Sequence, residues 1–155
     1  MTSNHLEEKL AFFIDRCKKI GFSVTHQRLA IYTELIRSKE HPSTEMIYQK
    51  VHKKFPTISL ATVYKTLNTF LTLKLVKLVN TSQDLSRYDG NLELHHHFVC
   101  QECGTVEDIP LSVIGPIKLS DKVVKEYNIV NYGIVLNGIC TLCQKKLKKG
   151  ITQGQ

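Results

Sequence analysis

Apolar residues along the first half of the chain recur at spacings of three and four, the period of amphipathic helices. The first stripe is followed by Gly21, a common residue at a helix end. Its members are Leu6, Leu10, Phe13, Ile14, Cys17 and Ile20. Because Cys17 lies on this stripe, we interpret it as a core residue.

Three further helices are expected, each beginning after a side chain that can cap a helix N-terminus. The caps are Thr25, then Ser43 or Thr44, and then Ser59. The apolar stripes that follow run to Ile36, Phe55 and Phe70, and Pro42 and Pro56 separate them. The pattern therefore predicts a helical N-terminal half.

The pattern changes after Phe70. Residues 75–79 and 86–88 flank a polar turn at residues 80–84, which predicts a β-hairpin. Helices followed by a hairpin are the order of a winged helix-turn-helix, in which the last helix before the wing enters the DNA major groove. A helical bundle with a hairpin and no role in DNA binding is the alternative.

In the winged-helix interpretation, the fourth helix presents small and polar side chains to DNA. These are Ser59, Ala61, Thr62, Tyr64 and Lys65. Hydroxyl and ammonium groups suit phosphates, and small residues allow close approach to the bases. Residues 1–90 carry 14 basic against 8 acidic side chains, whereas residues 91–155 carry 7 against 6. The surplus of basic side chains in residues 1–90 favours a polyanionic partner, although many lysine-rich surfaces are merely solvated.

The composition fits one ordinary domain or two small ones, since the 155 residues are 42% hydrophobic and 23% charged. The N-terminus does not resemble a signal peptide, and we find no stretch apolar enough to span a membrane. We therefore expect a cytoplasmic protein in which cysteines stay reduced.

The second half has a mixed pattern. Residues 97–100, 105–109 and 132–136 predict strands, and residues 111–126 predict a helix. An α+β unit of about 65 residues buries only a small core, so we expect zinc and self-association to stabilise it.

The second half contains two Cys-x-x-Cys pairs. The first is Cys100 and Cys103, and the second is Cys140 and Cys143. Two such pairs supply the four thiolates of a closed tetrahedral zinc site. Two disulfides, two inert pairs or a redox-active pair are the alternatives, but a redox motif needs only one pair.

The chain as a whole resembles the ferric uptake regulator family of metal-dependent transcription factors. The resemblance rests on motifs in the same order along nearly the whole chain: Thr25-His26-Gln27-Arg28, His41-Pro42, residues 58–64, Arg87-Tyr88-Asp89, His95-His96-His97, Cys100-x-x-Cys103-Gly104 and Gly138-x-Cys140-x-x-Cys143. It implies a winged-helix DNA-binding domain over residues 1–89, with Arg28 added to the DNA-binding residues. A short hinge near Asp89 and Gly90 then leads to a dimerisation and metal-binding domain over residues 90–155.

The resemblance also implies a regulatory metal site. Its ligands would be His41, Asp89, His95, His97 and Asp108. Three imidazoles and two carboxylates form a nitrogen and oxygen set suited to Fe²⁺ or Mn²⁺. On a strand His95 and His97 face the same side, and His96 the opposite one. The alternative is that His41 merely breaks a helix and the histidine run ends a strand.

An aspartate at position 89 is similar to the peroxide-sensing repressors of the family, whereas a glutamate is more usual in its iron sensors. The resemblance thus implies a repressor that senses hydrogen peroxide through oxidation of the ligands His41 and His95. It would bind an AT-rich palindromic DNA as a homodimer. An iron-responsive repressor is the main alternative. A zinc hydrolase or deaminase is disfavoured, because four thiolates close the zinc sphere and no His-x-Glu is paired with a Cys-x-x-Cys as deaminases require.

Overall fold

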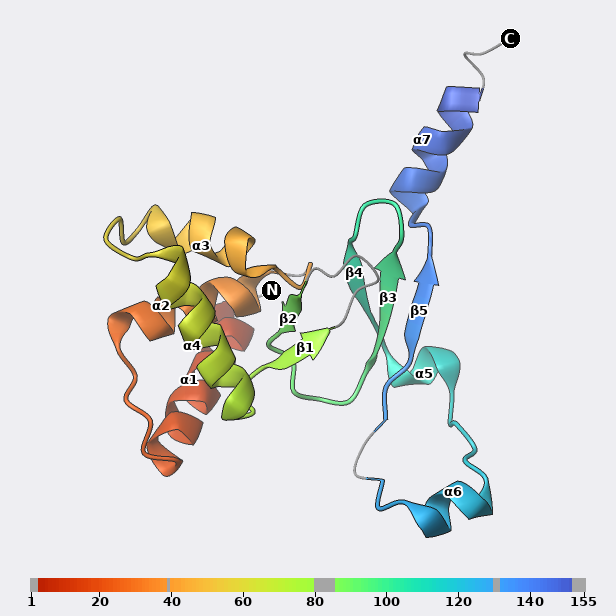
Figure 1. Ribbon diagram of the computed structural model, residues 1–155, viewed down its shortest axis with the longest axis horizontal. Helices are drawn as coiled ribbons and strands as arrows, with labels where there is room; N and C mark the ends of the chain where they lie inside the picture. The colour runs from red at the N-terminus through yellow and green to blue at the C-terminus, as the bar shows by residue number, and fades with distance from the viewer. Residues whose placement is uncertain (1–2, 39, 80–85, 130–131, 152–155) are drawn as a thin grey trace. The chain divides into compact units, whose positions relative to one another are not determined.

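The computed structural model describes residues 3–38, 40–79, 86–129 and 132–151, and these form a mixed α+β fold as expected. The chain divides into two compact units, Met1–Leu92 and Glu93–Gln155. Figure 1 shows the helices of the first unit and the three-stranded sheet of the second.

The four helices predicted for the first unit are present. They are α1 (Ser3–Lys19), α2 (His26–Arg37), α3 (Thr44–His52) and α4 (Leu60–Thr72). The predicted caps Thr25, Ser43 and Ser59 each accept a hydrogen bond from the backbone N–H three residues later. These bonds satisfy amides that the helix itself leaves without an acceptor. Local sequence therefore sets where α2, α3 and α4 begin.

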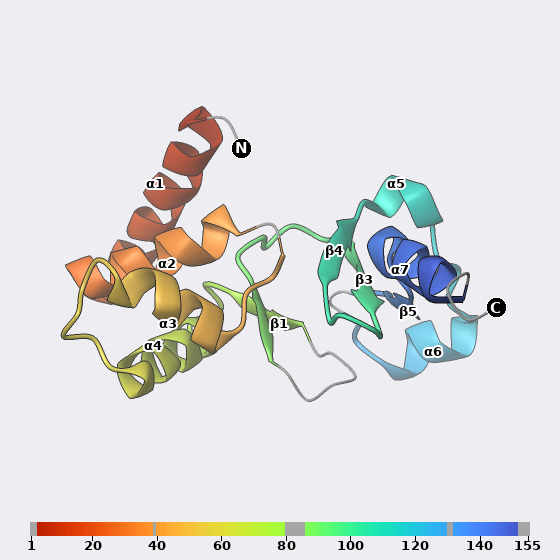
Figure 2. The same cartoon turned by 90° about the horizontal axis from the view of Figure 1, so that it is seen from above.

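Aromatic side chains from three helices form the centre of the first unit's core. Phe13 of α1 stacks on Tyr32 of α2 with ring centroids 3.9 Å apart, and Phe70 of α4 meets Phe13 edge to face at 5.3 Å. Cys17 is fully buried, which confirms its assignment to the core. Figure 2 shows α2, α3 and α4 gathered together, with α1 beside α2. This packing holds α4 by its apolar side and leaves its other side exposed.

The predicted hairpin is also present in the first unit. Strands β1 (Lys77–Val79) and β2 (Arg87–Asp89) pair antiparallel, and the predicted turn at residues 80–84 lies outside the described residues. The Tyr88 backbone N–H donates to the Pro42 carbonyl (3.1 Å). The hairpin is thereby joined to the segment that leads into α3.

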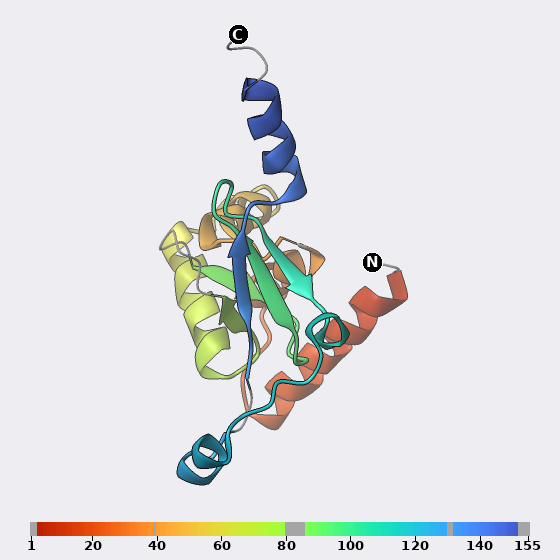
Figure 3. The ribbon, with the colours of Figure 1, turned by 90° about the vertical axis from the view of Figure 1, so that its right-hand side faces the viewer.

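The second unit contains a three-stranded sheet in the order β4-β3-β5 (Figure 3). Strand β3 (His96–Cys100) pairs antiparallel with β4 (Val106–Ile109), which confirms the first two predicted strands, and parallel with β5 (Val135–Gly138). The third strand was expected from residue 132, but pairing begins only at Val135, which lies opposite His97.

Two expectations for helices in the second unit need correction. The continuous helix over residues 111–126 is wrong: the structure has α5 (Leu111–Ile114) and α6 (Asp121–Glu126). Gly115 separates them with a φ of 78°, which a right-handed helix cannot contain, and Pro116 follows it. Helix α7 (Thr141–Ile151) was not anticipated.

Within the described part of the chain, no helix combines the length and apolar character needed to cross a membrane.

Candidate metal centres and nucleic-acid interface

The structure brings the four predicted cysteines of the second unit together. One sulfur from each of Cys100, Cys103, Cys140 and Cys143 lies within 4.8 Å of the other three. The Sγ atoms of Cys103 and Cys140 are 3.8 Å apart. Zinc–sulfur bonds of about 2.3 Å in a tetrahedron separate the sulfurs by about 3.8 Å. The arrangement therefore fits a zinc ion bound by four thiolates.

Two backbone turns position these sulfurs. Cys100 ends β3, and the Gly104 N–H donates to the Cys100 carbonyl (2.9 Å) to close the first turn. Gly104 has a φ of 67°, a left-handed conformation that glycine adopts without strain. Cys140 directly precedes α7 and Cys143 lies in its first turn, and β5 leads to them beside β3. The parallel β3–β5 pair thus delivers both cysteine pairs to one end of the sheet.

The protonation of this cluster also favours a cation. The Cys140 N–H donates to Cys100 Sγ (3.3 Å), and this bond is the main reason why the pKa of Cys100 falls to about 6. Hydrogen bonds to the sulfurs of Cys140 and Cys103 raise the pKa of Cys143 to about 12. A hydrogen bond with Thr105 also lowers the pKa of Cys103, so the cluster favours the thiolate form at Cys100 and Cys103 and opposes it at Cys143. A divalent cation supplies the charge that four adjacent thiolates require.

A second cluster in the same unit contains His95, His97 and Asp108. The Nε2 atoms of His95 and His97 are 2.9 Å apart, which confirms that the two rings face the same side. Asp108 Oδ1 lies 3.2 Å from His95 Nε2 and 3.8 Å from His97 Nε2. Two imidazoles and a carboxylate that converge in this way form a nitrogen and oxygen set able to hold a divalent metal.

Hydrogen bonds fix the orientation of these histidines. His95 Nδ1 lies 2.9 Å from the Glu93 carbonyl, so Nδ1–H donates there and Nε2 is left with a lone pair. His96 is fully buried and faces the opposite way, where its Nδ1 accepts the Ile134 N–H (3.2 Å). His96 is therefore part of the unit's interior and not of the cluster.

The two remaining predicted metal ligands, His41 and Asp89, lie in the first unit. Their side chains are 5% and 4% exposed, and His41 Nε2 is 3.7 Å from Asp89 Oδ1. His41 has a φ of 46°, an uncommon conformation for a residue with a side chain. Such backbone strain tends to occur at functional sites. Asp89 ends β2, and its Oδ1 accepts the Asn91 N–H (2.7 Å).

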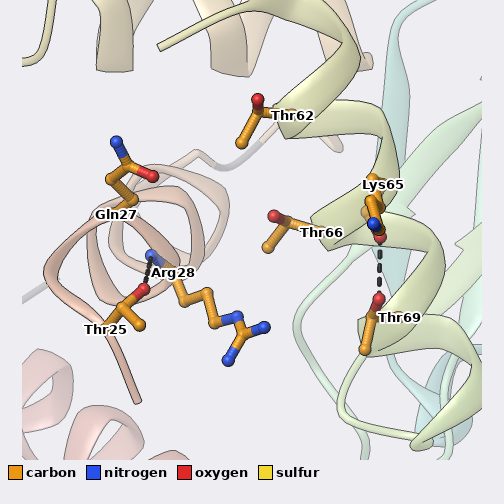
Figure 4. Close-up of a pocket in the computed structure, with 7 residues that line it drawn as sticks. All are labelled: Thr25, Gln27, Arg28, Thr62, Lys65, Thr66 and Thr69. Carbon is orange, nitrogen blue, oxygen red and sulfur yellow. Dashed lines mark hydrogen bonds between the residues drawn. The ribbon is translucent and has the colours of Figure 1, made fainter. Parts of the chain in front are cut away.

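The predicted DNA-contacting residues lie at the surface of the first unit. Ser59, Ala61, Tyr64 and Lys65 are exposed, and Arg28 and Thr62 are partly so. A hollow of about 370 Å³ lies between α2 and α4. Thr62 and Thr66 point into it from α4 (Figure 4). Its lining is polar and carries the positive charges of Arg28 and Lys65.

Arg28 has a structural attachment as well. Its guanidinium lies over the Phe22 ring, 4.2 Å from the centroid, and donates to the Ser23 carbonyl (2.7 Å). Four residues that line the hollow were not among the predicted DNA contacts, namely Thr25, Gln27, Thr66 and Thr69. Only their helical spacing relative to Arg28 and Lys65 could have indicated them.

Comparison with known proteins identifies the family of this chain. Residues 19–137 match the ferric uptake regulator family. The chain belongs to that family. A peroxide-responsive repressor of Staphylococcus epidermidis is 32% identical over 143 residues, which are 92% of this chain and 93% of the relative.

Solved structures of the ferric uptake regulator family share the fold. The ferric uptake regulator of Helicobacter pylori has a TM-score of 0.69 and 26% identity, and the match covers 90% of this chain and 93% of that protein. The peroxide stress regulator of Campylobacter jejuni has a TM-score of 0.60 and 32% identity, with coverage of 74% and 87%.

Proposed function

We propose that this chain is a metal-dependent transcriptional repressor that binds double-stranded DNA and releases it when peroxide oxidises its metal-ligating histidines. The observation that carries the proposal is the convergence of the His95, His97 and Asp108 side chains on one point. The 32% identity to a peroxide-responsive repressor supports the choice of signal.

The regulatory ion in this proposal is Fe²⁺ or Mn²⁺. Its ligands are His41, Asp89, His95, His97 and Asp108. His41 and Asp89 come from the first unit and the other three from the second, so the bound ion favours one arrangement of the two units over the others. DNA affinity then depends on metal because the arrangement of the recognition helices depends on it.

The structural ion in this proposal is Zn²⁺, held by Cys100, Cys103, Cys140 and Cys143. Its role is to stabilise a unit with a small core. Four thiolates leave no open coordination position for water, so a zinc hydrolase or deaminase is not favoured.

The proposed partners are DNA and a second copy of the chain. Helix α4 would enter the major groove with Ser59, Ala61, Thr62, Tyr64 and Lys65, while Arg28 contacts the backbone. The second unit exposes large apolar side chains, including Val124 and Tyr127 beside a hollow of about 450 Å³, which supports dimerisation through this unit. A homodimer would suit a palindromic, AT-rich operator. The proposed location is the cytoplasm.

The proposed way of sensing peroxide requires a histidine beside a redox-active metal. An Fe²⁺ ion bound there would reduce hydrogen peroxide and supply the oxidant for a ligand imidazole. His41 and His95 are the residues expected to gain oxygen, after which the site no longer orders the two units.

The decisive experiment compares Fe²⁺-loaded and Mn²⁺-loaded protein after brief exposure to dilute hydrogen peroxide. We expect the Fe²⁺ form to lose operator binding in a gel shift, and peptides with His41 or His95 to gain the mass of one oxygen. We expect the Mn²⁺ form to keep both its mass and its DNA binding.

The variant D89E is the matched control, because it keeps the charge and lengthens the carboxylate. We expect it to retain metal-dependent DNA binding with less histidine oxidation. An Fe²⁺-loaded wild type that survives peroxide with intact histidines contradicts peroxide sensing and favours the iron-responsive alternative.

A further inference from the structure

A short hydrogen bond joins the recognition helix α4 to the start of α3. The Tyr64 hydroxyl donates to Glu45 Oε1 (2.5 Å), and the Ser43 hydroxyl donates to Glu45 Oε2 (2.8 Å). Both oxygens of the carboxylate are therefore occupied by donors. A hydrogen bond from a hydroxyl to a carboxylate is shorter and stronger than one between neutral groups.

Glu45 is itself held in place by the N-terminus of α3. Ser43 Oγ accepts the Met46 N–H (3.3 Å) while its own proton goes to Glu45. Arg87 of β2 donates to Met46 Sδ (3.0 Å) and adds a positive charge near the carboxylate. The Tyr64 partner is thus a positioned acceptor and not a freely rotating side chain.

The direction of this hydrogen bond is chemically determined. A carboxylate can only accept, so the single proton of the Tyr64 hydroxyl points to Glu45. The bond to Tyr64 is the leading cause that lowers the pKa of Glu45, and the same bond raises the pKa of Tyr64. Near neutral pH Glu45 is therefore charged and Tyr64 keeps its proton.

Tyr64 remains 41% exposed on α4. With its proton committed, its oxygen can serve DNA only as an acceptor. In the major groove, adenine and cytosine present amino donors, whereas guanine and thymine present only acceptors and the thymine methyl group. A hydroxyl that only accepts therefore distinguishes these two pairs of bases.

We propose that Glu45 is a specificity-determining residue, which holds the Tyr64 hydroxyl as an acceptor and so makes it select adenine or cytosine over guanine or thymine at one operator position. This inference rests on the proposed function, in which α4 enters the major groove. Glu45 acts through Tyr64 and is a positioning residue.

The test is competitive binding of the Mn²⁺-loaded protein to an operator library in which every position carries all four bases, read by sequencing. Wild type, Y64F and E45Q are compared. Y64F removes the hydroxyl and keeps the ring. E45Q keeps the shape of Glu45 but adds an amide donor. This N–H can donate to the Tyr64 oxygen, so that the Tyr64 hydroxyl is free to donate its own proton to another acceptor.

We expect wild type to favour adenine or cytosine about fivefold at one position, the ratio typical of a single hydrogen bond. Y64F should lose this preference at that position alone. E45Q should lose it at the same position or shift it toward guanine or thymine. The variant E8Q makes the same charge change on α1 and should leave every base preference unaltered. Zinc content should match wild type in all three variants, and the melting temperature should fall by no more than about 4 °C in Y64F and E45Q, since each loses one exposed hydrogen bond.

Two results separate this inference from the proposed function. If wild type binds DNA selectively but Y64F and E45Q alter no common position, or if the shared position favours guanine or thymine, the inference is overturned and the proposed function stands. If wild type binds no DNA selectively with Mn²⁺, the proposed function fails, and the role of Glu45 fails with it.

Discussion

The two units of this protein are stabilised in different ways. The first unit has a core of fully buried aliphatic and aromatic side chains drawn from four helices, with Phe13, Tyr32 and Phe70 at its centre. Among the described residues of the second unit, the buried apolar side chains are Val99, Cys100, Val106 and Cys143, and two of these are candidate zinc ligands. Val113 and Leu142 are 68% and 70% exposed there.

Because of this difference, we expect the two units to draw their stability from different sources. Apolar burial contributes about 25 cal/mol per Å², so the first unit can be stable through its core alone. The second unit buries too little for that, so we expect its fold to depend on bound metal and on a partner surface.

The largest effect is expected from zinc loss. C140S should release the ion and unfold the second unit, because zinc contributes on the order of 10 kcal/mol to the folding of small zinc domains. Hydrogen exchange of peptides from each unit should show protection lost after residue 93 and kept before it. The control C17A alters the one cysteine of the first unit and should leave zinc content unchanged. Zinc retained by C140S contradicts the assignment.

A substitution in the aromatic core of the first unit should destabilise that unit alone. F70A removes a fully buried ring from the aromatic centre of the core and should lower the free energy of unfolding by about 3–5 kcal/mol. Denaturant unfolding followed by unit-specific hydrogen exchange measures it. The second unit should keep its zinc and its protection. A joint loss in both units would show that the two are not independent.

The neighbouring histidines of β3 separate metal sensing from packing. H97A should keep zinc and the stability of both units but lose the gain in DNA affinity that Mn²⁺ produces, because one ligand is missing. H96A should affect stability and not metal sensing, since His96 is fully buried on the other side of the strand. We expect it to destabilise the second unit and still respond to Mn²⁺. Gel shifts with and without Mn²⁺, together with thermal melts, distinguish the two.

The next effect concerns the charge of the first unit. K65A should weaken DNA binding about equally for all sequences and reduce the slope of log affinity against log salt by about 1, the change expected for one lost phosphate contact. Affinity measured between about 50 and 200 mM salt tests this. The control is K122A, which should leave the slope unchanged. Lys122 is an exposed residue of the second unit that pairs with Glu126.

The smallest effect is the titration of Glu45. Its pKa is lowered, first by the hydrogen bond from Tyr64, so this bond stabilises the fold above the ordinary pKa of glutamate and is lost as pH falls through the lowered value. Because Glu45 is exposed, we expect less than about 1 kcal/mol. Carboxyl NMR should show a higher pKa for Glu45 in Y64F than in wild type. An equal pKa in both would remove the physical basis for fixing the Tyr64 proton.

Sequence patterns served the first unit better than the second, for a physical reason. Caps such as Thr25 and Ser43 act within three residues, so local sequence reveals where helices begin. The β3–β5 pairing joins residues nearly forty positions apart, and no short-range pattern encodes it. Gly115 was a visible signal for the break between α5 and α6 that the predicted continuous helix overlooked. Helix α7 was missed because its leucines, Leu142 and Leu147, face solvent and give no buried stripe.

The candidate sites also differ in how far short sequence motifs revealed them. The four cysteines were recognised from their spacing, because metal chemistry constrains short motifs strongly. The histidines and carboxylates were assigned only through resemblance to a family. The bond between Glu45 and Tyr64 was not anticipated, since its partners are 19 residues apart and Glu45 belongs to none of the recognised motifs. Contacts between helices depend on packing angles that the sequence does not state.

The core of the first unit contains no residue beyond Tyr88, whereas the zinc cluster of the second requires both Cys100 and Cys143. During synthesis, the N-terminal core can therefore close while the second cysteine pair is still missing. Chains whose contacts are more distant in sequence fold more slowly, so the parallel β3–β5 pair should form late. We expect refolding in two phases, of which only the slower one speeds up as zinc is raised, and stopped-flow refolding at varied zinc concentration would measure both.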